Sequence, residues 1–176
     1  MLVARVLDGY IFKIQGVLGD IMTKSCREKL VCENPNQGTI KQCPDIWSDG
    51  GRLKTMLIPE PQKIDSLVRE IRQGSVITMS NLRTKLARDA GADMTCPMTT
   101  GIFLKIVACA AEEDRELGND VAPYWRVIKD DGKLNDKFPG EIIHHAELLE
   151  FEGHQVQKNR KGIKNHLSGF NEFQFD

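Results

Sequence analysis

Apolar residues first recur at helical spacing just after residue 60. Ile64, Leu67, Val68 and Ile71 stand at i, i+3, i+4 and i+7, which places their side chains on one face of a helix. Pro61 suits the first turn of that helix, and Gly74 suits its end. The pattern therefore predicts a helix between these two residues.

A second helical pattern follows a short β-prone link at residues 75–78. Ser80 is a residue type that caps helices, and Gly91 is one that ends them. The apolar positions between them are Leu82, Leu86 and Ala87, and the outward positions are Arg83, Lys85 and Arg88. We expect a helix with one basic, solvent-facing side.

The third pattern opens at Pro97, which is well placed as a first helical residue. The predicted buried face consists of Ile102, Phe103, Ile106, Val107 and Ala110, and the helix is expected to run to about Glu116. Two helices joined by a short turn that contains glycine are typical of a helix-turn-helix.

Strand and turn patterns come next along the chain. Residues 124–128 alternate as in a strand, and Asp130-Asp131-Gly132 is a hairpin-type turn that predicts a small wing. A last amphipathic helix is expected to end at Gly153, with Ile142, Ile143, Ala146, Leu148 and Leu149 on its apolar side. The predicted fold class is mainly α with a small β wing, a winged helix-turn-helix domain.

We expect this domain to cover residues 56–156. Residues 1–55 are predicted to be an N-terminal extension or arm, because Asn34-Pro35-Asn36, Cys43-Pro44 and Asp49-Gly50-Gly51 are dense in residues that break helices and strands. Residues 157–176 form a basic and aromatic tail, either solvated or docked through Phe170, Phe173 and Phe175. The polar start at Met22 suggests the hypothesis that residues 1–21 are an upstream extension of the reading frame.

Composition adds limits on compartment and partners. Lys and Arg number 24 against 25 Asp and Glu, so any DNA binding must come from local charge. Residues 1–21 hold no uninterrupted apolar run, so we expect neither a signal segment nor a membrane partner. Five scattered cysteines do not fit a secreted disulfide framework, and we expect a cytoplasmic protein.

Metal binding is not expected from the spacing of the candidate ligands. Cys26, Cys32 and Cys43 are separated by 6 and 11 positions, unlike a zinc ribbon. His144 and His145 are adjacent, so they face apart on a helix. The sequence points to no cofactor.

The order of several short motifs carries a family resemblance that covers residues 58–156. They are Gln73-Gly74 before Val76-Ile77-Thr78, Pro123-Tyr124-Trp125-Arg126-Val127, Asp131-Gly132-Lys133-Leu134, Phe138-Pro139-Gly140, and Leu148-Leu149 leading to Glu152-Gly153-His154. In this order, and around the helix-turn-helix, they resemble the C-terminal domain of the O6-alkylguanine-DNA alkyltransferase family, the methylated-DNA-protein cysteine methyltransferases. The resemblance extends to the alkyltransferase-like members that lack the acceptor cysteine.

The catalytic positions of that family are altered here. Where the family has Pro-Cys-His-Arg-Val, with the Cys as alkyl acceptor, this chain has Tyr124 and Trp125 in place of the Cys and His. A phenol is mostly protonated at neutral pH and an indole cannot act as a general base, so we expect no alkyl transfer. Glu152 matches the family's carboxylate but has no Cys–His pair to activate, and we expect it to be a helix-terminal surface charge.

Two further landmarks differ from the family. Met79 stands where the family has a Tyr before the helix-turn-helix. The position of the family's arginine finger, which fills the gap in the base stack, falls near Gly101 in this chain. Extruding a base from the duplex costs a few kcal/mol of unstacking. Because this chain lacks the arginine that acts as a wedge in the family, the resemblance implies inefficient base flipping.

The candidate DNA-binding residues are Arg83, Lys85, Arg88, Thr99, Thr100, Gly101, Lys105 and Arg126, with Lys129 nearby. The threonines and glycine at a helix start can bring amides and hydroxyls to phosphates, or can simply cap the helix. The cations can form a basic surface or serve only for solvation. Tyr124 is the candidate for stacking in a base pocket, while we expect Trp125, the other candidate, to pack.

The resulting hypothesis is a non-catalytic alkyltransferase-like protein that binds double-stranded DNA. The resemblance implies recognition of alkylated guanine or other damage, with a repair protein as a further partner. One alternative is an active methyltransferase that uses a non-standard cysteine such as Cys96, which precedes a helix start, although a buried Cys there is the simpler interpretation. The other alternative is a regulatory or protein-interaction module without lesion preference.

Overall fold

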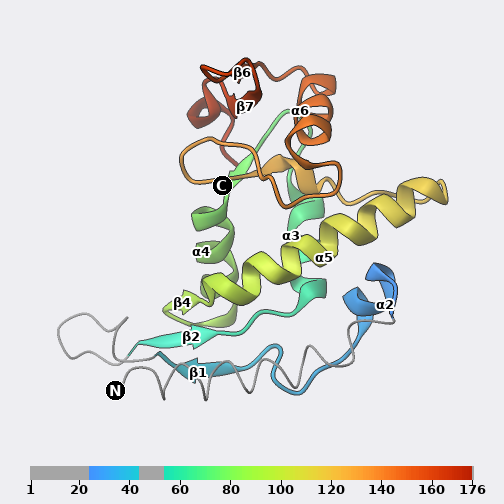
Figure 1. Ribbon diagram of the computed structural model, residues 1–176. Helices are drawn as coiled ribbons and strands as arrows, with labels where there is room; N and C mark the ends of the chain where they lie inside the picture. Colours follow the sequence, from blue (N-terminus) through green and yellow to red (C-terminus); the bar gives the residue numbers. More distant parts are fainter. Residues whose placement is uncertain (1–23, 44–53, 176) are drawn as a thin grey trace, which may run out of the picture.

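Helices dominate the computed structural model, which describes residues 24–43 and 54–175 (Figure 1). The α-helices are α2 (Cys26–Val31), α3 (Pro61–Glu70), α4 (Met79–Ala90), α5 (Pro97–Glu116) and α6 (Glu141–Phe151), with 3-10 helices η2 (Tyr124–Arg126) and η3 (Phe170–Phe173). The helices predicted from apolar spacing are confirmed. The predicted extension at residues 1–21 and the Asp49-Gly50-Gly51 turn lie outside the described residues.

Short strands link these helices in three small sheets within the described residues. The strands are β1 (Ile40–Gln42), β2 (Thr55–Leu57), β3 (Ile77–Thr78), β4 (Met94–Thr95), β5 (Val127–Ile128), β6 (Val156–Lys158) and β7 (Lys164–Leu167). β2 pairs antiparallel with β1 and parallel with β4, while β3 pairs parallel with β5. β6 and β7 form an antiparallel hairpin. The mainly helical fold class with little strand is therefore as expected.

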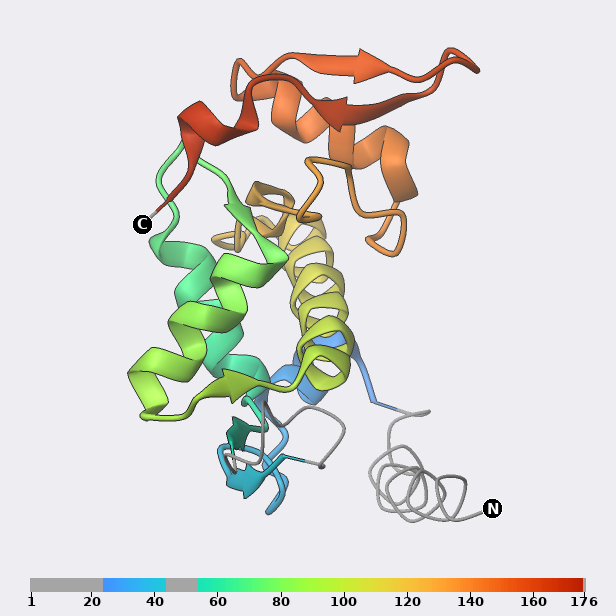
Figure 2. The ribbon, with the colours of Figure 1, turned by 90° about the vertical axis from the view of Figure 1, so that its left-hand side faces the viewer.

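Helix α5 packs against both α2 and α3, which also contact each other, and α4 contacts α3 (Figures 1 and 2). The buried residues of α5 join the core with Ile64 and Val68 of α3 and Leu82 of α4. Burial of these apolar side chains is the main source of stability, at about 1.5–3 kcal/mol for each large side chain.

The cap of helix α4 lies two residues before the predicted one. The Thr78 hydroxyl accepts a hydrogen bond from the Asn81 amide at 3.2 Å, so Thr78, not Ser80, caps the helix. Gly91 ends α4 in the left-handed conformation, with φ at 70°, as its position in the sequence predicts.

The predicted wing differs from the structure. Residues 124–126 form a 3-10 turn, because only Val127 and Ile128 have a partner strand, β3. The turn at 130–132 is present, with the Lys129 amide donating to the Lys133 carbonyl at 2.9 Å, but no named strand returns from it. A hairpin with two strands, β6–β7, lies instead at the end of the predicted domain and in the predicted tail.

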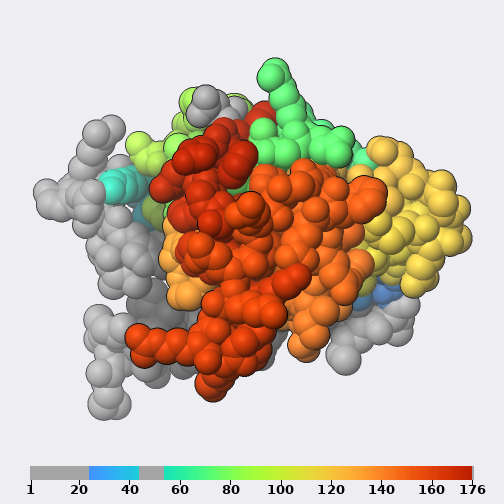
Figure 3. Space-filling model, turned by 90° about the horizontal axis from the view of Figure 1, so that it is seen from above, coloured from blue at the N-terminus to red at the C-terminus, as the bar shows by residue number. Residues whose placement is uncertain are grey.

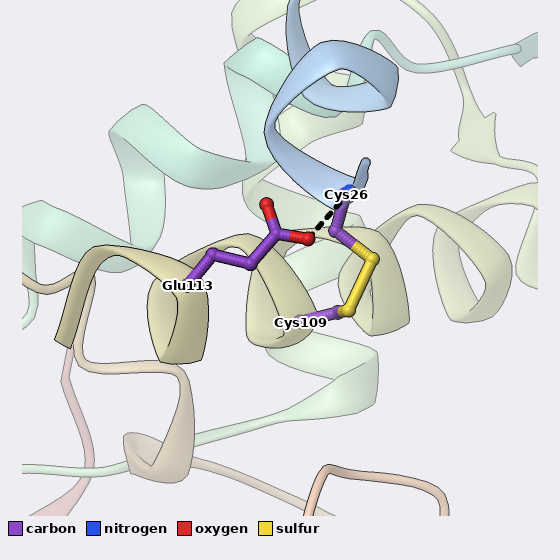
Figure 4. Close-up of side chains that lie close together, drawn as sticks. All are labelled: Cys26, Cys109 and Glu113. Carbon is purple, nitrogen blue, oxygen red and sulfur yellow. Dashed lines mark hydrogen bonds between the residues drawn. A yellow bond between two sulfur atoms is a disulfide. The ribbon is translucent and has the colours of Figure 1, made fainter. Parts of the chain in front are cut away.

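The N-terminal segment packs against α5 and is covalently joined to it (Figure 4). Cys26 of α2 forms a disulfide with Cys109 of α5, and the Glu113 carboxylate accepts hydrogen bonds from the Cys26 and Arg27 amides, both at 2.8 Å. The Arg27 guanidinium also pairs with Asp114 at 2.7 Å. Two of the five scattered cysteines therefore form a cross-link, which the sequence does not predict.

The C-terminal tail docks onto the helical body, as the second of the two sequence alternatives predicts: Phe170 and Phe175 pack against the core, and Phe173 makes an edge-to-face contact with His154. The Phe175 amide donates to the Val76 carbonyl, and the Val76 amide donates to the Phe173 carbonyl, both at 2.7 Å. Phe173 remains 38% exposed. Within the described residues, no helix is long and apolar enough to cross a membrane.

Candidate nucleic-acid interface

Helices α4 and α5 follow each other along the chain, and residues 91–96 connect them. β4 lies in this connection and pairs with β2, while the Thr95 hydroxyl donates to the Arg83 carbonyl at 2.9 Å. These bonds fix the approach of the chain to α5. The two helices predicted for the helix-turn-helix are both present.

The outer face of the first half of α5 consists of Met98, Gly101 and Lys105. They stand at i, i+3 and i+7, so they share one side of the helix, and all three are exposed. Gly101 has open space around it, since a Cβ added there would meet no atom within 4 Å. A glycine inside a helix costs roughly 0.5–1 kcal/mol relative to alanine, and packing within the described residues does not require one here.

The neighbouring candidates at the start of α5 are used within the fold. Thr100 is fully buried and its hydroxyl donates to the Cys96 carbonyl at 2.7 Å, so it is not available to DNA. Thr99 is half-buried, with a longer bond of 3.4 Å to the same carbonyl. Cys96 is 1% exposed, a buried thiol that packs with Cys43 and Met56.

The cations of α4 are partly engaged by other side chains. Arg83 hydrogen-bonds to the Ser80 hydroxyl at 3.0 Å and lies 3.8 Å from Asp130. The Lys85 ammonium lies over the Phe175 ring, 4.6 Å from its centroid. Arg88 is well exposed and lies 4.0 Å from Asp89. Arg83 and Lys85 therefore contact different neighbours on different sides of α4, and a single basic face of this helix stays a prediction.

Arg126 belongs to a buried ion pair, which removes it from the candidate DNA contacts. Its guanidinium makes several bonds of 2.7 to 3.0 Å to Glu152, whose side chain is 4% exposed. Trp125 Nε1 also donates to this carboxylate at 2.8 Å. Glu152 is thus not the expected surface charge. Although burial opposes ionisation, the bonds from Arg126 and Trp125 lower the pKa of Glu152.

Tyr124 lies in the core, not at the wall of an open base pocket. Its side chain has no exposed surface, and the hydroxyl donates to Glu112 Oε1 at 2.7 Å. Its ring makes edge-to-face contacts with Trp125 and Phe138. Burial, with the Glu112 carboxylate, raises the pKa of the phenol well above its ordinary value of 10. Tyr124 is therefore a packing residue, and Trp125 packs as expected.

His145 supports this region from α6. Its Nδ1 accepts from the Asn135 amide at 3.1 Å, so Nε2 carries the proton that it donates to the Trp125 carbonyl at 2.8 Å. Burial lowers the pKa of His145 to about 4. The ring is neutral at pH 7 and acts as a structural link between η2 and α6.

Two features of the structure were not among the candidates from sequence. One is the Cys26–Cys109 disulfide, because nothing in a separation of 83 positions marks the pair. The other is the β6–β7 hairpin, for which Asn159-Arg160-Lys161-Gly162 is a readable turn pattern between two short strands.

Comparison with known proteins gives two solved structures and no relative by sequence. No family model matches the chain, and no curated protein matches it. The chain is similar to Atl1 of S. pombe in complex with damaged DNA containing O6-carboxymethylguanine, with a TM-score of 0.47 and 22% identity over 66% of this chain and 94% of that one. A structure of S. pombe ATL in complex with DNA matches at a TM-score of 0.48 and 19% identity, with the same shares covered. The function proposed below rests on the residues of this chain.

Proposed function

We propose that this chain binds double-stranded DNA through the helix-turn-helix, with the outer face of the first half of α5 against the duplex. The observation that supports this most directly is Gly101. It is exposed in a helix, it costs stability there, and packing within the described residues does not require it. A glycine at such a position is explained when a partner must approach the helix backbone closely.

The charges around this face suit a phosphate partner. Lys105 lies on the same side of α5 as Gly101, and Arg88 of α4 is well exposed. Cations that neutralise phosphates release counterions, which makes DNA binding depend on salt and not on sequence. We infer a largely sequence-independent mode of binding.

The proposed binding involves no alkyl transfer. The acceptor position is a buried phenol with a raised pKa, and Cys96 is enclosed by apolar side chains. Recognition of an alkylated base and partnership with a repair protein are further proposals, which follow from the alkyltransferase-like resemblance of the motifs. Because Tyr124 is buried, a lesion preference would need surface other than the pocket expected from sequence.

The test is affinity for a labelled duplex, measured by fluorescence anisotropy at several salt concentrations. Gly101→Ala should raise the stability of the protein by up to about 1 kcal/mol and yet weaken DNA binding several-fold. Gly101→Gln should weaken it at least tenfold, since the longer side chain blocks the approach. Ser66→Gln is the matched control, because Ser66 is an exposed helical residue of α3.

The outcomes separate the candidate functions. Loss of binding in both Gly101 variants, but not in the Ser66 control, supports the proposal. Unchanged affinity in Gly101→Gln, or a wild-type protein that does not bind duplex at physiological salt, would reject it. Repeating the titration with one O6-methylguanine in the duplex tests the lesion preference, and equal affinity for both duplexes would leave general DNA binding.

A further inference from the structure

Positive charge is concentrated in one short segment near the end of the chain. Residues 155–168 contain Lys158, Arg160, Lys161 and Lys164 and no acidic residue. The rest of the chain therefore has 20 Lys and Arg against all 25 Asp and Glu. An anionic partner would be attracted to this segment in preference to the acidic remainder.

Three of these cations have no ion pair within the part of the chain that the structure describes. Lys164 pairs with Glu150 at 2.6 Å. Lys158, Arg160 and Lys161 are exposed, and no carboxylate of the described residues lies within 4.0 Å of their charged groups. Neighbouring carboxylates therefore neutralise their positive charges less than Asp130 neutralises that of Arg83 on α4.

The hairpin presents these side chains on a defined turn. The Asn159 side chain accepts hydrogen bonds from the Lys161 amide at 2.9 Å and the Ile163 amide at 3.1 Å. The Asn159 amide donates to the Ile163 carbonyl at 2.8 Å, and Gly162 adopts φ of 77°, which suits a glycine. The side chains of Arg160 and Lys161 take no part in these bonds, so the turn does not need their charges.

The base of the hairpin is fixed to the body of the protein. Leu167 of β7 is fully buried with Leu149 of α6, and its amide donates to the Gly132 carbonyl at 2.9 Å. The Leu134 amide donates to the Asn165 carbonyl, also at 2.9 Å. A packed base with an exposed tip fits a contact element more than a solvated tail.

The tip lies on the side of the molecule where α5 is found. In Figure 2 the hairpin crosses above α6, and its turn extends beyond the helical body on the same side as α5. Figure 3, seen from above, also shows this segment projecting from the edge of the molecule. The start of α5 lies beside β4 at the opposite end of the molecule, so a duplex that contacts both this face and the tip must run along this side from one end to the other (Figures 1 and 2).

We propose that the β6–β7 hairpin is a second contact for duplex DNA and that Lys158, Arg160 and Lys161 bind its phosphate backbone. This proposal rests on the proposed function. Phosphates are the favoured target because the exposed tip offers cations and no aromatic side chain for stacking on bases. The contact adds affinity without reading sequence.

The test removes the three charges together as Lys158→Ala, Arg160→Ala and Lys161→Ala and measures duplex affinity from 50 to 300 mM salt. Each phosphate contact contributes a slope of about 0.9 in log K against log salt, so the slope should fall by about two to three units and the affinity at least tenfold. The matched control is Lys29→Ala, Lys41→Ala and Lys63→Ala, which changes charge equally on α2, β1 and α3. Thermal unfolding checks that both variants are folded.

The outcomes distinguish the two proposals. If the wild-type protein binds duplex and the hairpin variant has the slope of the control, the hairpin contact is rejected while binding through α5 stands. If the wild-type protein does not bind duplex, both proposals fail. A loss that appears only with single-stranded RNA or with anionic lipid vesicles, and not with duplex DNA, would overturn the choice of partner. A hydroxyl-radical footprint that shortens at one end in the hairpin variant would support the proposal.

Discussion

Three separate segments of the chain meet at the carboxylate of Glu152. It accepts hydrogen bonds from Arg126, from Trp125 and, at 3.3 Å, from the amide of Gly74. A buried carboxylate of this kind is stable only while its partners remain, because an unpaired buried charge is costly. The residue that resembles a catalytic carboxylate in the sequence is thus structural here.

We predict that Arg126→Ala lowers the free energy of unfolding by about 3–5 kcal/mol, because it leaves the Glu152 charge buried without its partner. Urea denaturation at pH 7 measures this. The double replacement Arg126→Met and Glu152→Leu should be much less harmful, since it removes both charges. Equal losses in the single and the double variant would contradict the assignment of the cost to an unpaired charge.

The ionisation of Glu152 also makes the free energy of unfolding depend on pH in the acid range. The pKa of Glu152 is lowered in the folded protein, so its stabilising contribution is present above the ordinary pKa of about 4.5 and is lost as pH falls through the folded value. Glu152→Gln should flatten the loss of stability below pH 4.5 in urea titrations. Lys164→Ala, which removes an exposed partner of Glu150, is the control and should leave that slope unchanged.

His145 predicts a second, separate pH effect. Its pKa is about 4 in the folded protein against an ordinary 6.5, so the unfolded chain binds more protons between these values. The contribution of His145 to the free energy of unfolding has its full value above pH 6.5 and decreases by about 3 kcal/mol as pH falls to 4. NMR titration of the imidazole should give a midpoint near 4, and a midpoint near 6.5 would show that the ring is not buried and neutral.

At the scale of elements, local patterns predicted helices well and non-local pairings poorly. Ile64 to Ile71 are near neighbours in the sequence, so their shared face could be recognised from spacing alone. The β3–β5 pair joins Ile77 to Val127, which are far apart in the sequence, so spacing alone does not predict it. Thr78 caps α4 where Ser80 is expected, because the path of the backbone determines which side chain reaches the helix start. The spacing of motifs along the chain does not predict that Tyr124 is buried and donates a hydrogen bond to Glu112 of α5.

The Cys26–Cys109 disulfide joins two elements that are far apart in sequence. A cross-link that closes a loop of this length is expected to stabilise the protein by about 4.5 kcal/mol in the chain-entropy model. Cys26→Ser with Cys109→Ser should lose about that amount in urea denaturation, and adding a thiol reductant to the wild-type protein should have the same effect. Cys32→Ser is the control, because Cys32 is a free, half-buried thiol. A midpoint that reductant does not change would show that α2 is held without the bond.

At the scale of the whole molecule, the buried Tyr124 and Cys96 imply a protein that is unchanged after contact with DNA. We predict no gain in intact mass after incubation with excess duplex that contains O6-methylguanine. Mass spectrometry under the same conditions with an active alkyltransferase provides the positive control. A stoichiometric gain of one methyl group mapped to Cys96 would instead establish the methyltransferase alternative.

The cross-link between α2 and α5 also determines how the protein would respond to stretching. Cys26 and Cys109 are 83 positions apart, but their Cα atoms are 5.7 Å apart, so the backbone between them is a closed ring. A force applied at the two ends of the chain passes through the sulfur atoms and bypasses α3, α4 and half of α5. The fully stretched oxidised protein should therefore be shorter than the reduced one by about 280 Å, given roughly 3.4 Å for each extended residue. Optical-tweezer extension with and without reductant would measure this hidden length directly.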